Sequence, residues 1–191
     1  MSESNKFLES KGKLTSLLPM PITWQETLSL IRNMPYGRNS SRYDPSLVIT
    51  EMKGTCSSKH AVIKMIADEN HIQDVKLILC LYKMDGVNTP GIGKVLMENK
   101  ISYIPEAHCY LNIDGVKHDL INPTSDIARI EDAVLEEIEI SADQVAEFKV
   151  EFHKSFVKKW IEQSNIDYTF MEVWEIREKC IEALSSKKTK D

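Results

Sequence analysis

Apolar residues recur along most of the chain at the spacing of helices and strands. Thr23 and Glu26 have the form of a capping box, which predicts a helix that begins there and ends at Pro35. Closely spaced apolar residues over 56–68 predict a helix buried on much of its surface, and the apolar run at 75–81 predicts a buried strand. A helix that leads into a central strand is the expected result.

The clearest local signal lies in the middle of the chain, where two strand-like runs, 101–113 and 116–121, are joined by Asp114-Gly115. An Asp-Gly pair between two such runs favours a hairpin with a two-residue turn. Because this turn fixes the register of the two strands, we expect Tyr110 to lie directly opposite Asp119.

The C-terminal part of the chain is expected to be helical. Capping boxes at Ser141 and Thr169, each with Gln or Glu three residues later, are expected to open two helices that form a hairpin over about 141–186. Large aromatic residues three and four positions apart predict that the first of these helices packs on the core. Residues 124–137 are expected to be a polar connection.

These elements predict an α+β fold in a single domain over residues 1–191. The core, at about 38–124, is expected to pack the helix that begins at Cys56 on an antiparallel sheet, with the helical hairpin as a structural cap. A chain of 191 residues with 42% hydrophobic and 28% charged residues is ordinary for one globular domain.

The charge balance argues against some classes of partner. The formal net charge is −5, and the absence of a Lys/Arg cluster with interleaved aromatic residues argues against nucleic acid and anionic membranes. The basic run at 187–190 is expected to be a solvated tail. The apolar stretch at 14–18 stops at Pro19 and is too short for a signal peptide or a membrane span, so we expect a cytoplasmic protein.

The four cysteines are expected to be free thiols, because each lies in an apolar or helical pattern and no secretory signal precedes them. Cys80, Cys109 and Cys180 have the pattern of small buried hydrophobes. Cys56 instead stands in Gly54-Thr-Cys-Ser-Ser-Lys-His-Ala61, at the predicted start of a helix. Unpaired N–H groups and the positive end of the helix dipole favour a thiolate there, which makes Cys56 a candidate nucleophile.

A nucleophilic cysteine needs a base and a third group that orients the base. His108 is the best candidate base, because a strand holds its imidazole on one fixed face. The hairpin register places Asp119 on that face, diagonal to His108. A bulge or a longer turn would instead place Asn122 opposite His108, so Asn122 is the alternative orienter. An aspartate suits the task better, because it stabilises the imidazolium that forms when the thiol loses its proton.

The order of these residues resembles that of the transglutaminase-like superfamily, which shares the papain-like sequence of cysteine, histidine and aspartate. The resemblance covers roughly residues 38–124. It implies that Cys56 is the nucleophile, His108 the general base and Asp119 the orienting group. One departure is Asn122-Pro123-Thr124, which stands where the family has Asp-Pro-Thr, and it keeps the alternative orienter open.

The predicted reaction is attack of a thiolate on the carbonyl of a peptide, amide, ester or thioester, followed by transfer of the acyl group to water or to an amine. The Cys56 N–H is a natural oxyanion donor. A second donor is expected from the loop at 36–39, where Tyr36 and Arg38 are candidate substrate contacts. No motif for a nucleotide, flavin or metal is found, and the glycines at 91–94 lack the spacing of a phosphate loop, so we expect no cofactor.

His60 lies one helical turn after Cys56 and is expected to be a supporting or surface group, because a metal pair would need a second matching pair of ligands. The other histidines are expected to face solvent: His71, His118 and His153. The alternative function is a catalytically inactive module that binds a peptide or protein partner in the same groove, using the loop at 36–43 and the sheet edge.

Overall fold

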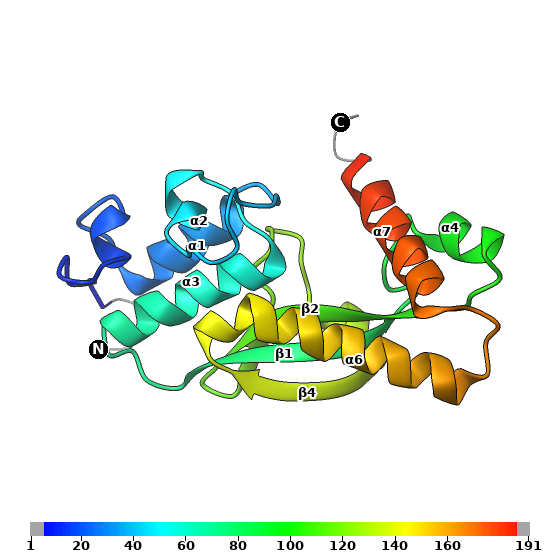
Figure 1. Cartoon of the computed structure of the whole chain (residues 1–191). Helices are drawn as coiled ribbons and strands as arrows, with labels where there is room; N and C mark the ends of the chain where they lie inside the picture. Colours follow the sequence, from blue (N-terminus) through cyan, green and yellow to red (C-terminus); the bar gives the residue numbers. More distant parts are fainter. Residues whose placement is uncertain (1–5, 187–191) are drawn as a thin grey trace. The chain divides into compact units, whose positions relative to one another are not determined.

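The computed structural model describes residues 6–186, and the basic run at 187–190 lies outside the described residues (Figure 1). The fold is mixed α+β, with a four-stranded antiparallel sheet and several helices. The elements in chain order are η2 (Thr15–Leu17), α1 (Trp24–Asn33), α2 (Leu47–Thr50), α3 (Cys56–Glu69), β1 (Val75–Met84), α4 (Gly93–Glu98), β2 (Ile104–Ile113), β3 (Val116–His118), α5 (Ala128–Glu131), β4 (Val134–Ile140), η3 (Ala142–Val145), α6 (Glu147–Ser164) and α7 (Phe170–Ser186).

Two of the predicted capping boxes form at the starts of helices. At α1 the Glu26 N–H donates to the Thr23 hydroxyl (3.3 Å), and the Thr23 N–H donates to the Glu26 carboxylate (2.8 Å). Thr169 and Glu172 make the same pair of hydrogen bonds at the start of α7. Each box satisfies two backbone N–H donors at the start of a helix, which confirms the predicted helix starts.

The hairpin between β2 and β3 has the predicted register. Ile113 pairs with Val116, and Leu111 pairs with His118. Asp114 and Gly115 have φ angles of 51° and 82°, the positive values that a tight hairpin turn requires at both central positions. The sheet order is β3-β2-β1-β4, so β3 and β4 are its edge strands.

Two expectations about residues 124–146 are wrong. Strand β4 forms where a polar connection was expected. As an edge strand it tolerates exposed glutamates, which hide the strand pattern in the sequence. The capping box of Ser141 and Gln144 forms, but it opens the short 3₁₀ turn η3, and α6 begins only at Glu147.

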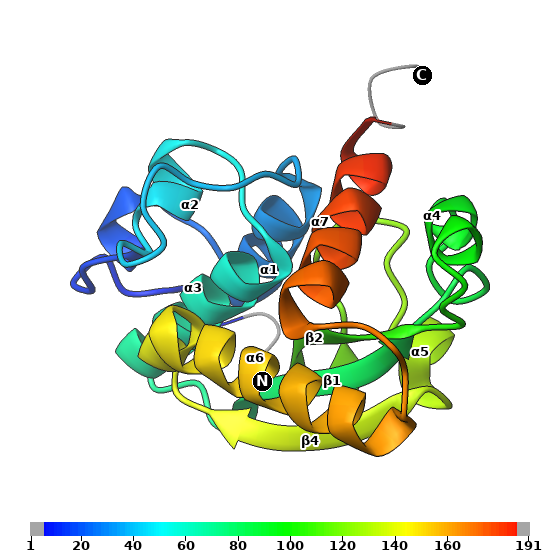
Figure 2. The same ribbon diagram turned by 45° about the vertical axis from the view of Figure 1, so that its right-hand side comes forward.

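The described chain forms two compact units, each assembled from three separate stretches, and the expectation of a single domain stays a prediction. The first unit runs to Cys80 and continues with His108–Ile127 and Glu137–Lys149. Within it α3 packs against α1, α2 and η3, and Figures 1 and 2 show α1 to α3 gathered together. Fully buried side chains of α1, α3 and β1 form its core: Ile31, Val62, Ile63, Ile66, Leu77 and Leu79.

The second unit comprises Leu81–Ala107, Ala128–Glu136 and the chain from Val150 onward. Within it α7 packs against α4, and Figures 1 and 2 show α7 turning away from α6. The two C-terminal helices are therefore present, but the hairpin that they form is splayed. In the part of the chain that the structure describes, no helix has both the length and the apolar composition that crossing a membrane requires.

The prediction that His153 faces solvent is wrong. His153 is 4% exposed, and its Nε2 is 2.8 Å from the Pro105 carbonyl oxygen, to which it donates. Val157 and Trp160 follow it at spacings of four and three residues and are also buried, so these three side chains define the inward face of α6. The predicted aromatic stripe includes Phe152, Phe156 and Trp160. Trp160 is buried as predicted, whereas Phe152 and Phe156 are only half-buried, each one position before a buried residue.

Candidate active site

Cys56 is the first residue of α3, and its side chain is half-buried. Thr55 caps the helix: its hydroxyl accepts from the Ser58 N–H (3.3 Å), and the Ser58 hydroxyl accepts from the Thr55 N–H (2.9 Å). A Cβ at Gly54 would lie 2.9 Å from the Lys59 Cγ, so the chain enters the helix at a point where only glycine fits. This packing presents the cysteine at the positive end of a 14-residue helix.

The structure brings His108 and Asp119 together as the hairpin register predicts. The His108 Nε2 lies 3.3 Å from the Asp119 Oδ2, which is an ion-pair contact rather than an aligned hydrogen bond. Only 12% of the His108 side chain and 4% of the Asp119 side chain are exposed. The Asp119 Oδ1 also accepts from the Ile121 N–H (3.2 Å), which fixes the carboxylate relative to its own backbone.

Asn122 is not placed to orient His108. Its Oδ1 accepts from the Thr124 N–H (2.9 Å) and from the Thr124 hydroxyl (2.8 Å), in a local turn. Its carbonyl oxygen accepts from the Arg32 Nε (3.1 Å). The side chain therefore stabilises the segment after the hairpin, and the geometry favours Asp119 as the partner of His108.

The pKa values of Cys56 and His108 are shifted in opposite directions. Burial raises the pKa of the Cys56 thiol. The charge of Lys149, the hydrogen bond and charge of His108 and the Cys109 backbone together outweigh burial and lower this pKa to about 6. Burial lowers the pKa of His108, but hydrogen bonds to Asp119 and Cys56 raise it to about 9. Burial raises the pKa of Asp119, and the contact with His108 outweighs this and lowers it. Both shifts favour the charged forms, a Cys56 thiolate and a His108 imidazolium, near neutral pH.

Lys149, in the first turn of α6, is the site residue that sequence reasoning missed. Its Nζ lies 3.9 Å from the Cys56 Sγ and donates a hydrogen bond to the Ser57 hydroxyl. It makes the largest contribution that lowers the thiol pKa. No local signal identifies it, because 93 residues separate it from Cys56 and lysines are frequent along α6.

His60 is fully buried and neutral, which excludes a surface position. The Leu120 N–H donates to its Nε2 (2.8 Å), so the ring proton is on Nδ1, which donates to the Cys56 carbonyl oxygen (2.7 Å). Burial and the charge of His108 lower its pKa to about 4, although Asp119 acts in the opposite direction. Its 3.9 Å approach to Asp119 is therefore not an ion pair. His60 ties the start of α3 to the chain next to Asp119.

Lys59 is the second buried support that the sequence did not reveal. Its Nζ donates to the carbonyl oxygens of Arg32 (3.3 Å), Met34 (2.5 Å) and Ile121 (2.6 Å), and the residue is 0% exposed. A buried ammonium with three acceptors links the end of α1, the start of α3 and the segment after Asp119. Lys59 and His60 together hold the elements that carry Cys56 and Asp119.

The loop with Tyr36 and Arg38 lies beside the chain that enters α3. The Gly37 N–H donates to the Gly54 carbonyl oxygen (3.1 Å), and the Asn39 Oδ1 accepts from the Ser58 hydroxyl (3.2 Å). Tyr36 is 41% exposed, and Arg38 is exposed. Their role as substrate contacts stays a prediction.

The other three cysteines are buried, as predicted. Burial raises the pKa of Cys80 to about 12 and that of Cys109 to about 11. It also raises the pKa of Cys180 to about 11, with a contribution from the charge of Glu106. These thiols are therefore protonated at neutral pH. Of the remaining histidines, His71 is exposed and His118 is half-buried.

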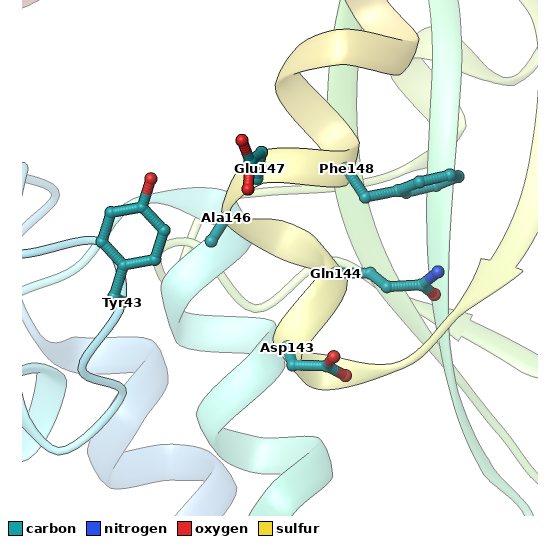
Figure 3. Close-up of a pocket in the computed structure, with 6 residues that line it drawn as sticks. All are labelled: Tyr43, Asp143, Gln144, Ala146, Glu147 and Phe148. Atoms are coloured by element: carbon teal, nitrogen blue, oxygen red, sulfur yellow. The ribbon is translucent and has the colours of Figure 1, made fainter.

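A shallow groove adjoins the site through the residues just before Lys149 (Figure 3). Figure 3 shows the Tyr43 ring on one side and Ala146 with Glu147 on the other, while the Phe148 and Gln144 side chains point away from Tyr43. The lining residues are Tyr43, Asp143, Gln144, Ala146, Glu147 and Phe148.

Within residues 6–186, no three His, Cys, Asp or Glu side chains are grouped in a way that could hold a metal ion. Comparisons of the chain with protein-family models, with curated proteins and with solved structures gave no match. The chemistry of this protein is therefore inferred from the atoms of the site itself.

Proposed function

We propose that this protein is a cysteine-dependent acyl-transfer enzyme in which Cys56, His108 and Asp119 form the catalytic triad. The observation that carries the proposal is the joint position of a half-buried cysteine at a helix N-terminus and an imidazole that is paired with a buried carboxylate. The opposite pKa shifts of Cys56 and His108 support it, because they give a nucleophile and a proton donor in the same pH range.

In the first half of the reaction, the Cys56 thiolate attacks the carbonyl carbon of an amide, ester or thioester. A C–S bond forms, and the π electron pair of the carbonyl moves onto its oxygen. The Cys56 N–H is positioned at the helix start to donate to this oxyanion. When the adduct collapses, the bond to the leaving group breaks, and His108 gives its proton to the departing amine, alkoxide or thiolate.

In the second half, neutral His108 takes a proton from water or from an amine, which then attacks the thioester carbonyl and releases Cys56. Asp119 holds the imidazole orientation and stabilises its charged form in both halves. The enzyme is a peptidase or amidase if water is the acceptor, and a transglutaminase-like acyltransferase if an amine is the acceptor.

The arrangement of the site also supports a transglutaminase-like core as the proposed fold family. The nucleophile starts a helix, the histidine lies on β2, and the aspartate follows β3 on the returning arm of the hairpin. These are the positions that the resemblance in the sequence implies for Cys56, His108 and Asp119. The same resemblance implies a peptide, amide or thioester substrate and no cofactor.

Capture of the acyl-enzyme tests the proposal. The chain is mixed with p-nitrophenyl acetate at neutral pH, quenched in acid and analysed by peptide mass spectrometry. We expect one acetyl group on Cys56 in the wild-type chain, none at that position in Cys56→Ala and a much slower reaction in His108→Ala. Acetylation spread over lysines, with Cys56 unmodified, would refute the proposal.

The groove beside Lys149 favours a second candidate function, a catalytically inactive module that binds a peptide. The exposed Tyr43 ring and the acidic side chains of Asp143 and Glu147 form a surface that suits an extended basic peptide. Binding of a Lys-rich peptide that Tyr43→Ala abolishes, together with an unreactive Cys56, would favour this module over the enzyme.

A further inference from the structure

The ammonium of Lys149 lies at the end of α3 where backbone N–H groups emerge. The Ser58 N–H is capped by Thr55, and the Lys59 N–H donates to the Thr55 carbonyl oxygen (3.0 Å). The Cys56 N–H is at the first helical position and has no intrahelical acceptor. Lys149 is held on the same turn by its hydrogen bond to the Ser57 hydroxyl, 3.9 Å from the Cys56 Sγ.

We propose that Lys149 is the second oxyanion donor of this site, acting with the Cys56 N–H on the tetrahedral intermediate. The inference rests on the proposed acyl-transfer function and deepens it. The second oxyanion donor is then Lys149 on α6, and not a group of the loop at 36–39 as expected from the sequence. It also makes Lys149 a catalytic residue, because its ammonium contacts the reacting oxygen.

The reach of the lysine fits this role. The oxygen of a tetrahedral adduct is two bonds away from Sγ, so a cation 3.9 Å from Sγ needs only a small shift to reach the roughly 2.7–3.1 Å of an oxyanion donor. The Lys149 side chain is half-buried, and its flexible stem permits this shift. The Ser57 hydroxyl limits the direction of the shift to the N-terminal turn of α3.

The charge movement of the reaction gives Lys149 a stronger interaction in the intermediate than in the free enzyme. When the C–S bond forms, the negative charge leaves Sγ and the carbonyl π pair places one negative charge on oxygen. The long contact to sulfur is thereby replaced by a short charge-assisted hydrogen bond to oxygen. Stabilisation that is greater at the oxyanion than at the thiolate accelerates the chemical step.

Two reactions of the same sulfur distinguish an oxyanion donor from a group that only sets the thiol pKa. Alkylation by iodoacetamide displaces iodide at a saturated carbon and forms no oxyanion, whereas acylation by p-nitrophenyl acetate passes through one. Both rates are measured from pH 5 to pH 10, so that each variant gives a limiting rate for its fully ionised thiolate.

For Lys149→Met we expect the limiting acylation rate to fall about 10²-fold. The limiting alkylation rate should stay within about threefold, because a thiolate of higher pKa is at least as nucleophilic. Lys149→Arg should retain most of the acylation rate. Ser57→Ala, which removes the hydrogen bond that holds the ammonium, should lower it by about three- to tenfold.

The matched control is Lys159→Met, an exposed lysine on the same helix, which should leave both limiting rates unchanged. A Lys149→Met chain whose limiting acylation rate equals that of the wild type would overturn the inference while leaving the triad intact. A wild-type chain that is alkylated rapidly at Cys56 but never acylated would overturn the proposed function and, with it, this role of Lys149.

Discussion

Cys56 in the first compact unit and Cys180 in the second both lie near charged side chains, but their pKa values are shifted in opposite directions. Each lies on a helix near charged side chains: Lys149 and His108 for Cys56, Arg177 and Glu106 for Cys180. The pKa of Cys56 is lowered to about 6, whereas that of Cys180 is raised to about 11.

The difference arises from how the charges are paired. Arg177 binds Glu106 through two hydrogen bonds of 2.7 Å, so its charge is satisfied by the carboxylate and the nearby thiol experiences mainly burial. In the other region the carboxylate of Asp119 pairs with His108, and the charges of His108 and Lys149 act on the sulfur. The cations beside Cys56 therefore lower its pKa, whereas the Arg177–Glu106 pair leaves the pKa of Cys180 raised.

The largest expected effect is a difference in reactivity between the two thiols. At pH 7.5 we expect iodoacetamide to label Cys56 on the order of 10²–10³-fold faster than Cys180, because only Cys56 is mainly ionised and only Cys56 is accessible. Peptide mass spectrometry of a time course measures both rates. Equal, slow labelling of the two cysteines would remove the contrast, and Cys56→Ala is the control for assignment.

The next effect tests the structural half of the comparison. Arg177→Met removes the two hydrogen bonds that Arg177 donates to the 7%-exposed Glu106, and we expect the free energy of unfolding to fall by about 3 kcal/mol. Urea denaturation measures this change. Lys179→Met breaks an exposed pair with Glu175 on the same helix and should cost less than about 1 kcal/mol. Equal losses of unfolding free energy in the two variants would mean that the Arg177–Glu106 pair stabilises the fold no more than an exposed ion pair does.

A smaller effect separates the two candidate orienters. Asp119→Asn removes a contact that raises the pKa of His108, so the pKa of Cys56 should rise and alkylation at pH 7 should slow by about tenfold. Asn122→Ala loses only the turn with Thr124, and its alkylation rate should stay within about twofold of the wild type. If Asn122→Ala alone shifts the pH profile of alkylation, Asp119 is not the orienter.

The parts of the site that the sequence predicted depend on local geometry. The turn at Asp114-Gly115 fixes the register through two residues with positive φ, and this register places Asp119 beside His108. The capping boxes at Thr23 and Thr169 are likewise decided within four residues. A signal of this kind can be read without knowledge of the rest of the fold.

The parts that the sequence did not predict depend on contacts between distant segments. Lys149 reaches Cys56 across 93 residues, and Lys59 reaches Ile121 across 62, so neither has a local pattern. His153 is a polar residue on a buried face, and only its contact with Pro105 reveals why it is there. Strand β4 lies at the sheet edge, where its glutamates are tolerated.

The ultraviolet absorbance of the Cys56 thiolate, measured against pH as the difference between wild type and Cys56→Ser, tests the central claim most directly. The lowered pKa means that the thiolate is present above pH 6 and is lost as the pH falls through that value. We predict a midpoint near pH 6 that moves upward in His108→Ala and in Lys149→Met. A midpoint close to the ordinary thiol value of about 8.5, unchanged in both variants, would contradict the thiolate–imidazolium pair on which the proposed function depends.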